Sequence, residues 1–131
     1  MSVAYREENN IGFIEFDQKD SKVNLLTAAA LRELDKILDP LAPAAIGPPR
    51  GRSLPAEKSS LKAVVIVSKK KDIFIAGADI KEIEGITQAE EGAQKSKAGQ
   101  DILNKLEDLP VPTIAVIDGV ALGGGCELAL A

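Results

Sequence analysis

The stretch ALGGGCELALA, residues 121–131, combines three consecutive glycines with an apolar segment of helical character and one carboxylate, Glu127. Glycine has no Cβ, so the backbone N–H groups of such a run can approach a ligand closely. No lysine followed by serine or threonine comes after the glycines, and a G-x-G-x-x-G motif starting at Gly123 would need glycine where Leu128 stands. A P-loop and a dinucleotide fingerprint are therefore disfavoured. Two alternatives remain open: a plain strand-to-helix turn, or an oxyanion hole whose N–H donors bind a developing enolate oxygen beside Glu127.

A second glycine turn lies earlier in the chain, in the sequence GAD at residues 77–79. Asp79 precedes Glu82 by three residues, and this D-x-x-E spacing is typical of a capping box at the start of a helix. In the simpler interpretation Asp79 caps that helix and Gly77 permits an unusual turn. In the functional interpretation this turn supplies one N–H donor and the glycine run supplies the other.

The remaining sequence alternates strand and helix patterns, which predicts an α/β fold. Residues 11–16 alternate apolar and polar side chains, as a half-buried strand does. Thr27 is placed to cap a helix that Asp39-Pro40 ends. Two later β-branched runs predict buried strands of a parallel sheet, the first of them covered on both faces. The predicted strands are at 3–5 (an edge strand), 11–16, 61–68 and 113–118, and the predicted helices are at 28–38, 80–86 and 88–109.

Residues 40–60 are rich in proline and also contain two glycines. Proline fixes φ and lacks an amide donor, so this Pro/Gly-rich segment is predicted to be an exposed loop. The segments on either side are too small to fold separately. We therefore interpret residues 1–131 as part of a single domain, with 40–60 as a loop within it.

Composition disfavours several classes of function. A net charge of −4 and an aromatic content of 3% argue against a nucleic-acid partner. The sequence contains no histidine, so metal sites and histidine-based triads lose their usual ligand and base, and no metal is predicted. Cys126 has no basic neighbour and is expected to be a small, buried thiol. No apolar run approaches the ~20 residues that span a bilayer, and the N-terminus is no signal peptide, so a cytoplasmic location without a membrane span is expected.

FIAGADIKEI (74–83) and PVPTIAVIDGVALGGGCELALA (110–131), with the spacing between them, closely resemble the enoyl-CoA hydratase family, also called the crotonase superfamily. SKVN (21–24) is similar to the N-terminal hydratase part of multifunctional fatty-acid oxidation proteins. The resemblance covers nearly the whole chain except residues 40–60. It implies a crotonase-like spiral of ββα units, of which this chain is expected to form the first half, and an acyl-CoA thioester as the binding partner.

The same resemblance implies roles for individual residues. By motif position, the peptide N–H groups of Ala78 and Gly124 form the oxyanion hole, and Glu127 is a catalytic acid or base for adding water across the 2,3 double bond. A second family glutamate lies beyond Ala131. The presence of Glu127 favours a hydratase over members that only isomerise double bonds. The neighbouring residues of the two turns are expected to line the substrate: Ala76, Gly77, Asp79, Ile80 and Gly123.

The resemblance implies no cofactor other than the coenzyme A of the substrate, with NAD required only if a dehydrogenase domain follows. The parent protein is expected to be an enoyl-CoA hydratase of β-oxidation, whereas the 131-residue chain alone is expected to be inactive. Two alternatives stay open: a binding or assembly fragment, or another superfamily reaction such as isomerisation or thioester hydrolysis. Apolar surface around Leu128 and Leu130 is expected to be exposed and to favour a homo-oligomer.

Overall fold

The computed structural model describes residues 1–42 and 61–131, and most of the predicted 40–60 loop lies outside the described residues. Within them, the order strand, strand, helix recurs along the chain, with two helices in the second unit. This order confirms the predicted α/β class. The strands are β1 Val3–Glu8, β2 Ile11–Phe16, β3 Ala63–Ser68, β4 Ile73–Ile75, β5 Thr113–Val116 and β6 Val120–Ala121, and the helices are α1 Ala28–Leu38, α2 Ile80–Glu84, α3 Ala89–Glu107 and α4 Gly124–Leu130.

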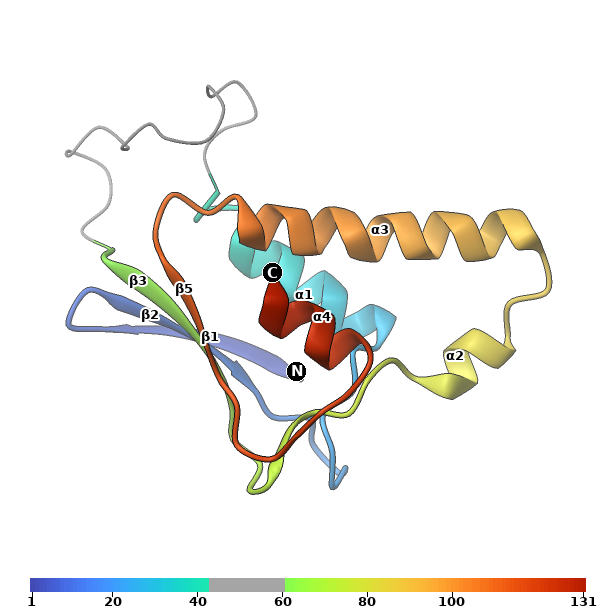
Figure 1. Cartoon of the computed structure of the whole chain (residues 1–131), viewed down its shortest axis with the longest axis horizontal. Helices are drawn as coiled ribbons and strands as arrows, with labels where there is room; N and C mark the ends of the chain where they lie inside the picture. The colour runs from blue at the N-terminus through green and yellow to red at the C-terminus, as the bar shows by residue number, and fades with distance from the viewer. Residues whose placement is uncertain (43–60) are drawn as a thin grey trace.

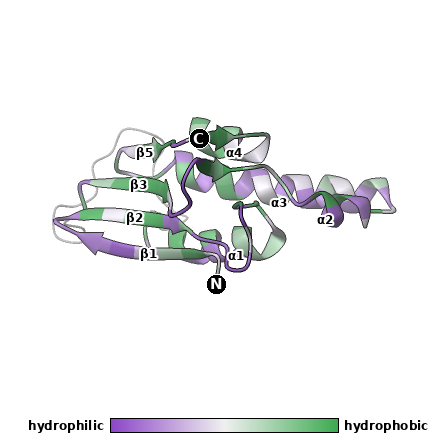
Figure 2. Cartoon of the chain, turned by 90° about the horizontal axis from the view of Figure 1, so that it is seen from below, coloured by the Kyte–Doolittle hydropathy of each residue, from purple (hydrophilic) through white to green (hydrophobic). Residues whose placement is uncertain are grey.

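The larger sheet has the strand order β1-β2-β3-β5 (Figure 2). Strands β1 and β2 form an antiparallel hairpin through Asn9 and Asn10, whose φ angles of 52° and 63° suit the tight turn of such a hairpin. Strands β2, β3 and β5 are parallel, as the β-branched runs predicted. The predicted edge position of the first strand is also confirmed, although β1 continues to Glu8.

Burial in this sheet alternates along the strands, so the predicted coverage of both faces is wrong. In β3, Val64 and Ile66 are buried, whereas the residues between them are half-buried. In β5, Ile114 is 49% exposed and Val116 is 45% exposed. Strand β5 is at the end of the described sheet, and only one face of it is covered by the core.

Helix α1 packs on the larger sheet, and the C-terminal part of α3 packs against α1, whereas the N-terminal part of α3 extends away from the sheet (Figure 1). Thr27 caps α1 as predicted, because its side chain accepts a hydrogen bond of 3.0 Å from the Ala30 amide. The apolar faces of the two helices meet in the core, where Leu34, Leu38 and Leu106 are fully buried. In the described residues no helix is both long and apolar enough to cross a membrane.

The side chain of Asn24 joins the two sheets. It is 1% exposed, and its amide nitrogen donates to the carbonyls of Phe16 and Phe74 and to the Ser68 hydroxyl. Its oxygen accepts from the Gln18 amide at 2.9 Å. Each of these partners lies in or next to β2, β3 or β4, so one buried amide fixes the ends of three strands.

Strands β4 and β6 form a small second sheet on which α4 packs. Leu128 of α4 is buried at 1% exposure, which corrects the prediction that apolar surface is exposed around this residue. Leu130 is 83% exposed, as expected.

Candidate active site

The two glycine turns predicted to carry function lie side by side. Gly77 follows β4 and has φ +101°, and Gly123 follows β6 and has φ +47°. Both values lie in the region that side chains other than glycine rarely adopt. A Cβ built on Gly123 would lie only 3.8 Å from the Cα of Gly77. Because β4 and β6 are hydrogen-bonded neighbours, the turns after them emerge at the same edge of the small sheet.

Each of these turns leaves one backbone N–H group, that of Ala78 or that of Gly124, without a hydrogen-bond partner in the described protein. The Gly77 carbonyl accepts from the Leu26 amide at 2.8 Å, and in a trans peptide the following N–H, that of Ala78, points to the opposite side. The Gly123 carbonyl accepts from the Glu127 amide at 3.0 Å, so the N–H of Gly124 likewise points out of α4. Within residues 1–42 and 61–131, neither N–H donates to another protein group.

Glu127 stands beside the second of these amides. It lies one turn into α4, and its Oε2 is 3.8 Å from the position that a Cβ on Gly124 would occupy. Ala78, Gly124 and Glu127 line one cavity of about 290 Å³ between α1, α3 and α4. The site therefore combines two unpaired N–H donors and one carboxylate, which is the arrangement needed to hold a carbonyl oxygen near an acid or base.

Comparison with known proteins identifies the family. A sequence profile described as enoyl-CoA hydratase/isomerase matches residues 53–131, more than half of the chain. The chain belongs to the enoyl-CoA hydratase/isomerase family.

Two relatives in this family are fatty acid oxidation complex alpha subunits. The one from Vibrio parahaemolyticus is 38% identical over 125 residues, which cover 95% of this chain and 16% of the relative. The one from Shewanella halifaxensis is 49% identical over 73 residues, which cover 56% of this chain and 10% of the relative. The predicted similarity to multifunctional fatty-acid oxidation proteins is thus confirmed, and the chain spans about one sixth of the first relative's length.

Solved structures confirm the crotonase-like fold. An enoyl-CoA hydratase from Bacillus anthracis matches with a TM-score of 0.78 and 27% identity, covering 99% of this chain and 45% of that one. A protein described as an enoyl-CoA hydratase/carnithine racemase from Magnetospirillum magneticum matches with a TM-score of 0.79 and 23% identity, covering 98% and 43%. The present chain therefore has the fold of part of an enoyl-CoA hydratase domain.

The other residues predicted to contact substrate have different surroundings. Ala76 donates its amide to the Asn24 carbonyl at 2.9 Å, and Ile80 is 68% exposed on α2. Asp79 caps α2 by accepting from the Lys81 amide at 3.0 Å. In the described part of the chain, five of the predicted residues are not among those lining the cavity: Ala76, Gly77, Asp79, Ile80 and Gly123. Gly77 and Gly123 instead shape the turns that orient the two amides.

Two local predictions from the sequence are wrong. Glu82 was expected to complete a capping box with Asp79, but its Oε2 accepts from the amide of Ala28, the first residue of α1, at 2.9 Å. The carboxylate thus connects α2 to the start of α1. Cys126 was expected to be buried, yet it is exposed, whereas Gly125 and Leu128 of the same helix are buried.

Helix α3 supplies a wall of the cavity that was not predicted. The contributing residues recur with helical spacing, so they share one face. Leu26 and Leu31 form the apolar side of the same cavity. The sequence contained one hint of this wall: Gly99 lies inside the helical pattern, where glycine is unfavourable and so suggests a special role. The α3 residues of the cavity are Lys95, Ser96, Gly99, Gln100 and Leu103.

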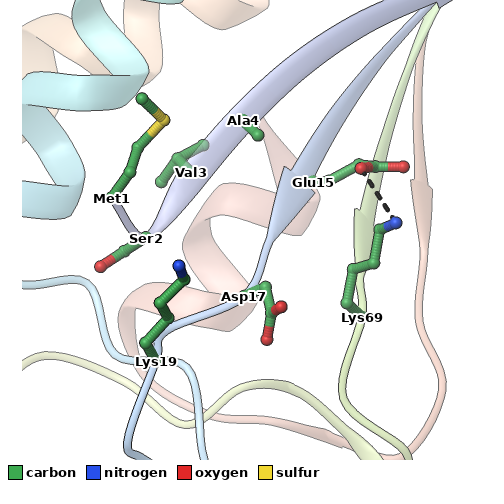
Figure 3. A pocket seen from close by; sticks show the side chains of 8 residues that line it. All are labelled: Met1, Ser2, Val3, Ala4, Glu15, Asp17, Lys19 and Lys69. Atoms are coloured by element: carbon green, nitrogen blue, oxygen red, sulfur yellow. Dashed lines mark ion pairs between the residues drawn. The ribbon is translucent and has the colours of Figure 1, made fainter.

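A second cavity, of about 310 Å³, lies at the N-terminus and carries no comparable chemistry (Figure 3). Its charged side chains have both signs, and Lys69 is already paired with Glu15 at 3.2 Å. None of the residues predicted to be catalytic lines it. Among the described residues, no group of three histidine, cysteine, aspartate or glutamate side chains could hold a metal ion.

Proposed function

We propose that this chain forms the part of an enoyl-CoA hydratase active site that holds the thioester oxygen and supplies one catalytic glutamate. The observation that carries the proposal is the shared cavity, in which the free N–H groups of Ala78 and Gly124 lie with the carboxylate of Glu127. Membership of the enoyl-CoA hydratase/isomerase family and similarity to fatty acid oxidation complex alpha subunits support a 2-enoyl-CoA of fatty-acid β-oxidation as the substrate.

The proposed chemistry follows from these groups. Water adds to C3 of the enoyl thioester, and the electron pair of the 2,3 double bond moves toward the thioester carbonyl. The two N–H groups stabilise the negative charge that develops on the thioester oxygen. Glu127 exchanges a proton with the water or with C2, so that one proton ends on C2 and hydroxide ends on C3. The product is a 3-hydroxyacyl-CoA, and coenzyme A is needed only as part of the substrate.

A second candidate is an acyl-CoA-binding fragment without turnover. One feature of the site favours it: in the described lining of the cavity, Glu127 is the sole carboxylate. The resemblance implies a second glutamate beyond Ala131, and we propose that hydration needs this residue. In this view residues 1–131 bind the thioester, and the full-length protein hydrates it.

The test compares Glu127→Gln with the unchanged residue in the full-length protein encoded by the gene. Glutamine keeps the size of the side chain but cannot exchange the proton, so we expect kcat for crotonyl-CoA hydration to fall by about 100- to 10,000-fold. Circular dichroism should be unchanged because Glu127 is exposed. Cys126→Ser, an exposed neighbour on α4, is the matched control and should retain activity.

Product analysis separates the reaction classes within the family. Gain of one water by the thioester supports hydration, a moved double bond at unchanged mass supports isomerisation, and free coenzyme A supports thioester hydrolysis. Full hydratase activity in Glu127→Gln would refute the proposed role of this residue. Robust turnover by the 131-residue chain alone would refute the second candidate.

A further inference from the structure

Gly99 is a glycine inside a helix that no packing contact explains. It lies in the interior of α3, where glycine is less favourable than alanine because it loses more conformational freedom on folding. A Cβ built on Gly99 would meet no atom within 4 Å, and its φ is not positive. Gly125 of α4 is different, since a Cβ there would lie 2.3 Å from the Ile75 carbonyl oxygen. Neither steric contact nor backbone conformation therefore requires glycine at position 99.

The open space beside Gly99 belongs to the cavity that contains Glu127. Leu26, Leu31 and Leu103 line it together with Gly99, whose α3 neighbours Lys95, Ser96 and Gln100 add polar groups. The leucines give this part of the cavity an apolar surface. Its volume of about 290 Å³ is close to the lower end of the range for small-molecule sites. A Cβ at position 99 would meet only open space, at a point where Gly99 lines this cavity.

We propose that Gly99 is a specificity-determining residue that keeps the cavity open for the hydrocarbon chain of a long acyl group. The inference rests on the proposed function, because the thioester must be held at Ala78 and Gly124 for its acyl chain to pass Gly99. A linear acyl chain is the part of the substrate that needs apolar contacts, and it would lie between Gly99 and the leucine side chains. In this proposal a short acyl group leaves the space beside Gly99 empty.

The experiment compares the affinities of the purified protein for butyryl-CoA and decanoyl-CoA by isothermal titration calorimetry. Gly99→Leu fills the space with a side chain that suits a helix. We expect it to weaken decanoyl-CoA binding by about tenfold or more, while butyryl-CoA binding changes by less than about twofold. Gly99→Ala, which occupies less space, should have a smaller effect of the same kind.

Ala98→Leu is the matched control. Ala98 is exposed on α3 and is not among the residues lining the cavity, so the same leucine one position earlier should leave the ratio of the two affinities unchanged. Equal affinity ratios in Gly99→Leu and the unchanged protein would overturn the inference while leaving the proposed function intact. If the unchanged protein bound neither thioester, the proposed function would fail as well.

Discussion

Replacing Gly125 by alanine tests whether α4 is seated directly on β4, a contact that places Gly124 and Glu127 in the site. A Cβ on Gly125 would lie 2.3 Å from the carbonyl oxygen of Ile75 and 2.8 Å from the Cβ of Ile75. The same carbonyl accepts the Leu122 amide at 3.0 Å, so it cannot move aside without weakening that hydrogen bond. Relief of the clash therefore requires α4 to withdraw.

The expected loss of stability follows from two opposing effects. Overpacking of a closely fitted interface costs about 1–3 kcal/mol, and the upper end applies because the obstacle is backbone. Alanine improves helix propensity over glycine by about 1 kcal/mol. The net prediction for Gly125→Ala is a decrease of about 2 kcal/mol in the free energy of unfolding.

Gly99→Ala is the control for helix propensity alone. The new Cβ meets nothing within 4 Å, so we expect the free energy of unfolding to rise by about 0.5–1 kcal/mol. Urea unfolding followed by circular dichroism measures both variants, and their transition midpoints should shift in opposite directions. A Gly125→Ala variant as stable as Gly99→Ala would refute the close packing of α4 on β4.

Two further predictions concern the sheet. Asn24→Ala should lower the free energy of unfolding by about 3 kcal/mol, because it removes a buried amide and leaves the carbonyls of Phe16 and Phe74 without their donor. Urea unfolding should then show a midpoint at a lower urea concentration. For Glu15, burial raises the pKa, but hydrogen bonds from Arg6 and Lys69 outweigh it and hold the pKa below its usual value. The resulting stability is present above the ordinary carboxyl pKa of about 4.3 and is lost as the pH falls through the lower folded value. Arg6→Gln should therefore flatten the acid side of the stability-pH curve, and an unchanged curve would contradict this ion pair.

Much of the fold is predictable because local patterns and packing agree. The alternation in β2 and the Thr27 cap of α1 are local patterns that agree with the packing of the core. Strands β4 and β6 were not predicted, because segments of two or three residues carry no periodicity. The exposed side of β5 was also missed, since a β-branched run does not reveal whether both faces are covered.

In the candidate site, too, features set by nearby residues could be predicted, whereas features set by packing between distant segments could not. The glycine turns and Glu127 could be found in the sequence because their chemistry depends on backbone conformation and residue type. For the wall provided by α3, the sequence offered only the glycine within the helical pattern, because the wall itself depends on long-range packing that brings residues of α3 and α4 to one cavity. Glu82 was misassigned for a similar reason, since its partner Ala28 is 54 residues away in the chain.

The most direct test of the account is an NMR titration of the ¹⁵N-labelled chain with crotonyl-CoA, with free coenzyme A as the control. If the thioester oxygen binds between the two turns, the amide signals of Ala78 and Gly124 should shift most with crotonyl-CoA. They should shift little with free coenzyme A, which has no thioester carbonyl. Unchanged signals from both amides while other residues respond, or equal shifts with the two ligands, would contradict the proposed oxyanion site.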